Sequence, residues 1–176
     1  MFSKQTGQGR AIPVYFEFLM SPIAKGSQNL FIMAVIARFL KALGHRTVHL
    51  VCDRGFMIPV LVRFLVAENI TFTIRIKAGK QVVAQGAKKS VTKLKKRDSL
   101  VQVYGQTLRV VRSKKQPDNK EPWYLLTNDV ALTADQVITR YYHRFEIEEF
   151  FKDAKRLSEA EYFLHMKDIT FTTTLW

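Results

Sequence analysis

The chain has 176 residues, with 28 Lys or Arg against 15 Asp or Glu and a formal net charge of +13. This length suits one ordinary domain with or without an insertion, and 47% hydrophobic residues exclude a wholly disordered chain. A single cysteine, Cys52, excludes an internal disulfide framework. Arg38 and Arg63 interrupt the best candidates for a membrane span, and the first residues lack the apolar stretch of a signal peptide. We therefore expect an intracellular, cytoplasmic protein with no membrane partner.

The first part of the chain alternates between strand and helix patterns. They cover residues 11–20 (strand), 27–43 (helix), 47–52 (strand), 56–68 (helix) and 70–77 (strand). Gly44 ends the first helix, and Pro59 is tolerable in the first turn of the second. This order favours an α/β sheet, in which functional sites gather at the carboxyl ends of strands. Asp53 follows the strand 47–52 and is predicted to lie at such an end.

Helical periodicity disappears between Gly79 and Asn128. Residues 100–104 and 107–112 alternate around Gly105-Gln106, which predicts a hairpin, and residues 123–127 form a further strand pattern. We expect a small β-rich insertion here.

The insertion also carries most of the positive charge. From Arg75 to Lys115 there are 13 Lys or Arg and one acidic residue, Asp98, which gives this block a charge of +12. Such a block usually binds a polyanion, and no amphipathic basic helix points to a membrane instead. A nucleic acid is the predicted partner. The alternative is a solvated, flexible basic loop, and residues 87–97 fit that description too.

A long helical pattern begins near Ala134 and runs to Leu157 without Gly or Pro. Within it, Tyr141, Arg144, Glu148 and Lys155 fall in an arc of about 60° at about 100° per residue. Apolar residues flank this arc, and charges on an apolar face are costly unless they are paired, metal-bound or used. The geometry leaves two interpretations open: an intrahelical ion pair, since Arg144 and Glu148 are four residues apart, or a functional site.

These four residues form the pattern Y-x2-R-x3-E-x6-K, which resembles the signature of the insertion-sequence-four (IS-four) DDE transposases. The segment V-C-D-R-G-F around Asp53 resembles the part of the family that bears the second catalytic Asp. The segment W-Y-L-L-T-N from Trp123 resembles its tryptophan-bearing strand. The resemblance implies a ribonuclease-H-like core over residues 1–78 and 129–176, interrupted by the basic β-rich insertion over residues 79–128.

The resemblance also implies a chemistry, cut-and-paste DNA transposition by metal-dependent phosphoryl transfer. Asp53 and Glu148 would be catalytic carboxylates that bind Mg²⁺ (or Mn²⁺), so their side chains should lie within about 4–8 Å of each other. The partner would be the double-stranded DNA of the transposon ends, bound by a dimer in the synaptic complex.

The remaining signature residues would contact that DNA. Tyr141, Arg144 and Lys155 would hold phosphates, where Arg offers bidentate contacts and Lys a point charge. Trp123 would take up a flipped base, and a purely structural tryptophan is the alternative.

One departure from the family pattern bears on activity. The family uses three acids, the first on the opening strand of the sheet, but only Glu17 precedes Asp53 here. Residues 7–15 resemble the turn into the family's third strand. We therefore expect a chain truncated at both ends, with the first strand and its Asp missing, that is inactive alone. The alternative is a non-catalytic DNA-binding remnant that interferes with a full-length transposase. An unrelated RNA-binding protein is disfavoured because no RNA-module motif appears.

Overall fold

The computed structural model describes residues 2–5, 8–15, 17, 27–44, 46–114, 121–157 and 173–175, with the backbone only for 154–157 and 173–175. It is a mixed α/β structure that divides into two compact units. One unit comprises residues 49–142, and the other comprises residues 1–48 and 143–176. The predicted boundaries at 78/79 and 128/129 stay predictions. Among the described helices, none is long and apolar enough to cross a membrane.

The unit 49–142 begins with a strand–helix–strand motif. Strand β3 (His49–Cys52) lies parallel to β4 (Thr71–Ile76), and helix α2 (Pro59–Ala67) connects them after a short 3-10 helix, η1 (Arg54–Phe56). Pro59 stands at the first helical position, where its missing N–H costs nothing. The sequence predicted these elements to within a few residues at each end.

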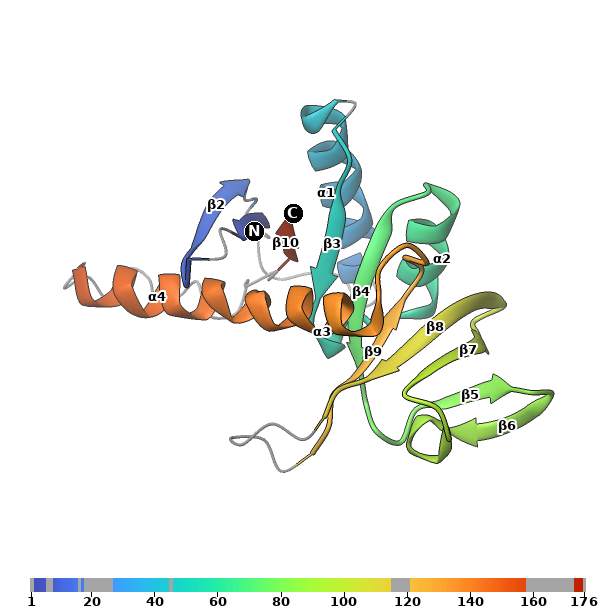
Figure 1. Cartoon of the computed structure of the whole chain (residues 1–176). Helices are drawn as coiled ribbons and strands as arrows, with labels where there is room; N and C mark the ends of the chain where they lie inside the picture. Colours follow the sequence, from blue (N-terminus) through green and yellow to red (C-terminus); the bar gives the residue numbers. More distant parts are fainter. Residues whose placement is uncertain are drawn as a thin grey trace. The chain divides into compact units, whose positions relative to one another are not determined.

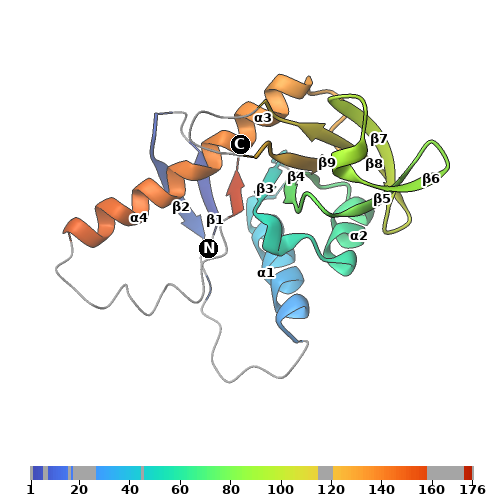
Figure 2. The same ribbon diagram turned by 90° about the horizontal axis from the view of Figure 1, so that it is seen from below.

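The same sheet continues with antiparallel strands, in the order β3-β4-β9-β8-β7-β5-β6 (Figures 1 and 2). The added elements are β5 (Gln81–Ala84), β6 (Ala87–Ser90), η2 (Val91–Lys93), β7 (Asp98–Val103), β8 (Gln106–Arg112), β9 (Tyr124–Thr127) and α3 (Ala134–Tyr142). Helix α3 packs on β8 and β9. Within residues 87–97, β6 and η2 have regular structure, so the predicted alternative of a loop throughout this segment is wrong.

The two hairpin turns of this region explain a difference from the prediction. The central residues of both turns, Gln85-Gly86 and Tyr104-Gly105, have positive φ angles. A turn with two positive φ angles matches the twist of the strands that it joins. The β7–β8 turn is therefore centred one residue earlier than the predicted Gly105-Gln106, and the non-glycine Tyr104 takes a left-handed conformation at φ 55°.

The other unit contains strands β1 (Phe2–Gln5), β2 (Ala11–Tyr15) and β10 (Thr173–Leu175) and helices α1 (Ser27–Leu43) and α4 (Glu146–Leu157). Strand β1 pairs antiparallel with β2 and parallel with β10. Helix α1 packs through Phe39, whose ring stacks on Phe2 with centroids 4.2 Å apart, and α4 packs through Ile147 on Ala11. Neither β1 nor β10 was predicted from the sequence. Its predicted strand 11–20 ends at Tyr15 in β2, and residues 16 and 18–20 lie outside the described part.

The prediction of one uninterrupted helix over residues 134–157 is wrong. A 3-10 turn, η3 (His143–Phe145), separates α3 from α4. A 3-10 turn brings residues three apart into line, and His143 Nδ1 lies 2.7 Å from Oε1 of Glu146, three residues later. Arg144 also lies over the ring of Phe145, 4.5 Å from its centroid. Consequently the four signature residues do not share one continuous α-helical face.

A buried histidine links three elements of the unit 49–142. His49 of β3 is 4% exposed; its Nε2 lies 2.9 Å from Oγ1 of Thr73, and its Nδ1 lies 3.2 Å from Oδ2 of Asp129. Burial and the positive charge of Arg140 lower the pKa of His49 to about 4, although Asp129 acts in the opposite direction. The folded state therefore holds this imidazole neutral at neutral pH.

We predict a pH-dependent stability from His49. Its pKa is about 4 in the folded chain against the usual 6.5 of histidine, so the unfolded chain binds the extra proton between these values. The stabilisation is fully present above pH 6.5 and is lost as the pH falls towards 4, at up to about 1.4 kcal/mol per pH unit. Denaturant unfolding across this pH range should show that the free energy of unfolding falls more steeply with decreasing pH for the wild type than for His49→Gln. Equal slopes would contradict the prediction.

Candidate active site

Asp53 stands at the carboxyl end of β3, immediately after buried strand residues. Leu50 and Val51 are fully buried, and Asp53 starts the 3-10 helix η1, its Oδ1 accepting the Arg54 N–H at 2.7 Å. The residue therefore has the bonding of an ordinary turn aspartate. Its carboxylate nevertheless lies at the end of the strand, where the sequence placed a site.

Tyr141 lies next to this carboxylate although it is 88 positions away in the sequence. Its hydroxyl donates to Asp53 Oδ1 at 3.4 Å, and its ring meets Trp123 edge-on with centroids 5.3 Å apart. The guanidinium of Arg75, on β4, lies 5.9 Å from the Trp123 ring centroid. The structure thus brings together Asp53, Tyr141 and Trp123. Arg75 was not predicted from the sequence; the available signal was one arginine within an otherwise uncharged strand.

The Trp123 side chain is enclosed. It is 2% exposed, and besides Tyr141 and Arg75 it stacks with Tyr142 at 6.4 Å between ring centroids. This packing is that of a structural tryptophan. A base-stacking role stays a prediction and requires a face of the ring to become exposed.

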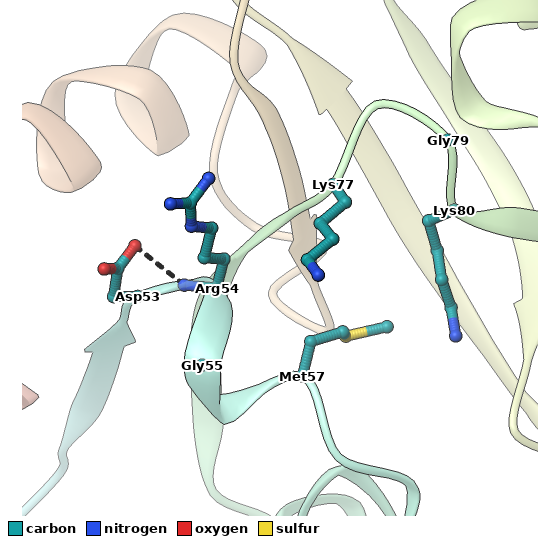
Figure 3. A pocket seen from close by; sticks show the side chains of 7 residues that line it. All are labelled: Asp53, Arg54, Gly55, Met57, Lys77, Gly79 and Lys80. Carbon is teal, nitrogen blue, oxygen red and sulfur yellow. Dashed lines mark hydrogen bonds between the residues drawn. The ribbon is translucent and has the colours of Figure 1, made fainter.

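A cavity of about 910 Å³ lies beside Asp53 (Figure 3). Its lining residues are Asp53, Arg54, Gly55, Met57, Lys77, Gly79 and Lys80. Three of these are cationic and one is acidic, so the cavity favours an anionic ligand. The sequence analysis did not single out these three cations. A signal was available in the sequence. Lys77 and Lys80 follow the strand β4, and Asp53 and Arg54 follow β3, which is parallel to β4.

Glu148 lies in the other unit, at the beginning of α4. Its Oε1 accepts a hydrogen bond from Nη2 of Arg144 at 2.8 Å; the Glu148 side chain is 49% exposed and that of Arg144 is 6% exposed. The ion pair expected from the i,i+4 spacing is therefore present. The backbone of Lys155 belongs to α4, and its side chain lies outside the described residues. The convergence of Glu148 with Asp53 stays a prediction, because the two residues belong to different units.

The two carboxylates have the chemistry of ligands for a divalent metal ion. Carboxylate oxygens are the ligands that Mg²⁺ prefers, so the chemistry of Asp53 and Glu148 fits. Each also keeps one oxygen, Oδ2 and Oε2, without a hydrogen bond to the described residues. No group of three or more His, Cys, Asp or Glu that could hold a metal occurs in the described part of the chain.

Glu17, the acid that precedes Asp53 in the sequence, is already engaged. Arg38 donates to both of its carboxylate oxygens, and the Tyr15 hydroxyl donates to Oε1. The hydrogen bonds from Arg38 and then from Tyr15 lower the pKa of Glu17 to about 2. A metal ion at Glu17 would have to displace these donors.

Comparison with known proteins identifies a family. A family model described as a transposase DDE domain matches residues 32–161, which is most of the chain. A comparison with curated proteins gives no significant match.

The packing of Trp123 predicts the effect of its removal. Trp123→Ala should lower the free energy of unfolding by about 3–5 kcal/mol, because it leaves a cavity among Tyr141, Arg75 and the strand core. Leu100→Ala is the control: Leu100 is 66% exposed, and its truncation should change stability by no more than about 0.5 kcal/mol. Denaturant unfolding measures both variants. A Trp123→Ala variant as stable as the control would show that Trp123 is not a core residue.

Proposed function

Because the chain belongs to the transposase DDE domain family, we propose that it takes part in DNA transposition through metal-dependent phosphoryl transfer, as a member of the insertion-sequence-four group. The observation that supports this most directly is Asp53 at the end of β3, beside a cationic cavity and within reach of the Tyr141 hydroxyl. A carboxylate beside cations is suited to a substrate whose phosphates must be held close to a metal ion. The parallel β3–α2–β4 motif agrees with a ribonuclease-H-like core.

Asp53 and Glu148 are the proposed metal ligands. Divalent ions, Mg²⁺ or Mn²⁺, would stabilise the attacking and leaving oxygens when bound. Tyr141 orients the Asp53 carboxylate through its hydroxyl, and Arg144 orients the Glu148 carboxylate through its ion pair. These contacts fix the carboxylates before substrate arrives. Lys155 is the further cation that we propose for a DNA phosphate.

The proposed partner is double-stranded DNA, with a dimer of the protein in the synaptic complex. A second cavity, of about 460 Å³, supports a polyanion: Lys89, Lys93, Lys95 and Lys96 are among its lining residues. Asp98 also lines this cavity but is paired with Arg109. The lysines therefore keep their attraction for phosphates.

Arg97 belongs to the same basic block but has a different role. Its guanidinium pairs with Asp135 at 2.5 Å and donates to the Arg112 carbonyl at 3.2 Å. The pair with Asp135 also lowers the pKa of that carboxyl, first through the hydrogen bond and then through the charge of Arg97. Arg97 thus contributes to the fold, and the lysines are the better candidates for DNA contacts.

We further propose that residues 1–176 alone do not cleave DNA. Only Glu17 precedes Asp53 among the acids, and its carboxylate is held by Arg38 and Tyr15. Two carboxylates can hold one metal ion, but the arrangement around both reacting oxygens is then incomplete. The alternative function, a DNA-binding protein that interferes with a full-length transposase, requires the same DNA binding without cleavage.

The test combines DNA binding and cleavage with the purified chain. We expect binding to a DNA duplex that weakens steeply with salt, and little or no cleavage in Mg²⁺ or Mn²⁺. Absence of DNA binding at low salt would contradict the proposed function. Cleavage that Glu148→Gln abolishes would contradict the proposed inactivity, and Glu17→Gln would then show whether Glu17 completes the site.

A further inference from the structure

Lys80 is shared by two cavities of the unit 49–142. It lines the cavity beside Asp53 and also a smaller one of about 180 Å³, whose other lining residues include Lys88, Gln102 and Tyr104. We propose that Lys80 contacts a DNA phosphate and that Tyr104 positions it, so that the bound strand passes from the Asp53 cavity onto the β5–β7 part of the insertion. This inference rests on the proposed function, which supplies DNA as the polyanion.

The backbone around Lys80 is fixed before any ligand binds. The Lys80 N–H donates to the Lys77 carbonyl at 2.9 Å and closes the turn after β4. Two bonds from the end of β6 and the start of η2 hold this turn: Val91 N–H donates to the Lys80 carbonyl at 3.0 Å, and Ser90 Oγ donates to the Ala78 carbonyl at 2.8 Å. The turn therefore presents Lys77 and Lys80 from a rigid support.

The Lys80 side chain is held as well. Its Nζ donates to the Tyr104 hydroxyl at 2.6 Å and lies 4.1 Å from the centroid of the same ring. The Tyr104 hydroxyl in turn donates to the Met57 carbonyl at 3.3 Å, in the loop that follows Asp53. These directions are consistent, because an ammonium group only donates and a hydroxyl both accepts and donates.

This restraint has a consequence for binding. A free lysine side chain loses rotamer freedom when it contacts a ligand, and prior ordering by Tyr104 removes part of that cost. An ammonium group has three N–H donors, and the bond to Tyr104 uses one of them. The others suit phosphate oxygens. Through its bonds to Lys80 and to the Met57 carbonyl, Tyr104 also connects the β7–β8 turn with the loop that follows Asp53.

The distribution of the cations favours a strand over a small anion. Arg54 and Lys77 line the cavity beside Asp53, Lys88 lines the smaller cavity, and Lys80 lines both. Among the described residues that line the smaller cavity, none is acidic. Cations spread along two adjoining cavities match successive phosphates of a polymer, whereas a single phosphate would require cations that converge on one point.

The experiment measures the affinity for a fluorescent DNA duplex over a series of salt concentrations. Lys80→Gln should weaken binding roughly tenfold at about 0.1 M salt and reduce the slope of log affinity against log salt by about 0.9, the effect of one lost phosphate contact. Lys80→Arg should retain the slope. Tyr104→Phe keeps the ring and all charges, so it should weaken binding a few-fold with the slope unchanged.

Arg63→Gln is the matched control, because Arg63 is exposed on α2 and lines neither cavity. If wild type binds DNA and Lys80→Gln keeps the slope of the control, the inference is wrong while the proposed function stands. If wild type does not bind DNA, the proposed function fails first. A deoxynucleoside monophosphate can also be used as a competitor of the labelled duplex. If it displaces the duplex as well as unlabelled duplex does at the same phosphate concentration, the proposed path of a strand along both cavities is wrong.

Discussion

The arrangement of the unit 49–142 depends on one carboxylate, that of Asp129 in the loop between β9 and α3. Its Oδ2 lies 3.2 Å from His49 Nδ1 on β3, and its Oδ1 accepts the N–H groups of Ala131 and Leu132 at 3.0 and 3.3 Å. Its backbone carbonyl accepts from Arg109 of β8 at 2.5 Å. A single residue thus joins β3, the entry to α3 and the insertion. The imidazole beside it stays neutral at neutral pH, so His49 takes part in this arrangement as a hydrogen-bonding group and not as a cation.

This constraint explains why the candidate site is assembled from distant segments. The loop fixed by Asp129 sets the start of α3, and α3 carries Tyr141 to the carboxylate of Asp53. Trp123 fills the space behind Tyr141, at the point where β9 begins. The insertion also contacts the loop after Asp53, because the Tyr104 hydroxyl donates to the Met57 carbonyl in that loop. The insertion is therefore part of the surroundings of the site as well as a source of positive charge.

The sequence predicted what local patterns and the family resemblance determine. Alternating strand and helix patterns predicted the β3–α2–β4 motif and placed Asp53 at a strand end. Gly44 marked the end of α1, and Pro59 was compatible with the first turn of α2. What it missed depends on contacts between distant residues or on short elements. Strand β1 has only four residues, without a clear alternation, and it is recognisable through its pairing with β2. The break at η3 has no Gly or Pro to mark it. The hydrogen bond between Lys80 and Tyr104 joins positions 24 residues apart, so no local sequence pattern predicts it.

The central claim, that Asp53 and Glu148 bind one metal site together, is tested most directly by the affinity of the chain for Mn²⁺ in the presence of a DNA duplex. Electron paramagnetic resonance of free Mn²⁺ measures this affinity without requiring cleavage. We predict that Asp53→Asn and Glu148→Gln each remove most of the binding, because the proposed site requires both carboxylates. A variant of either residue that binds Mn²⁺ as tightly as the wild type would contradict it.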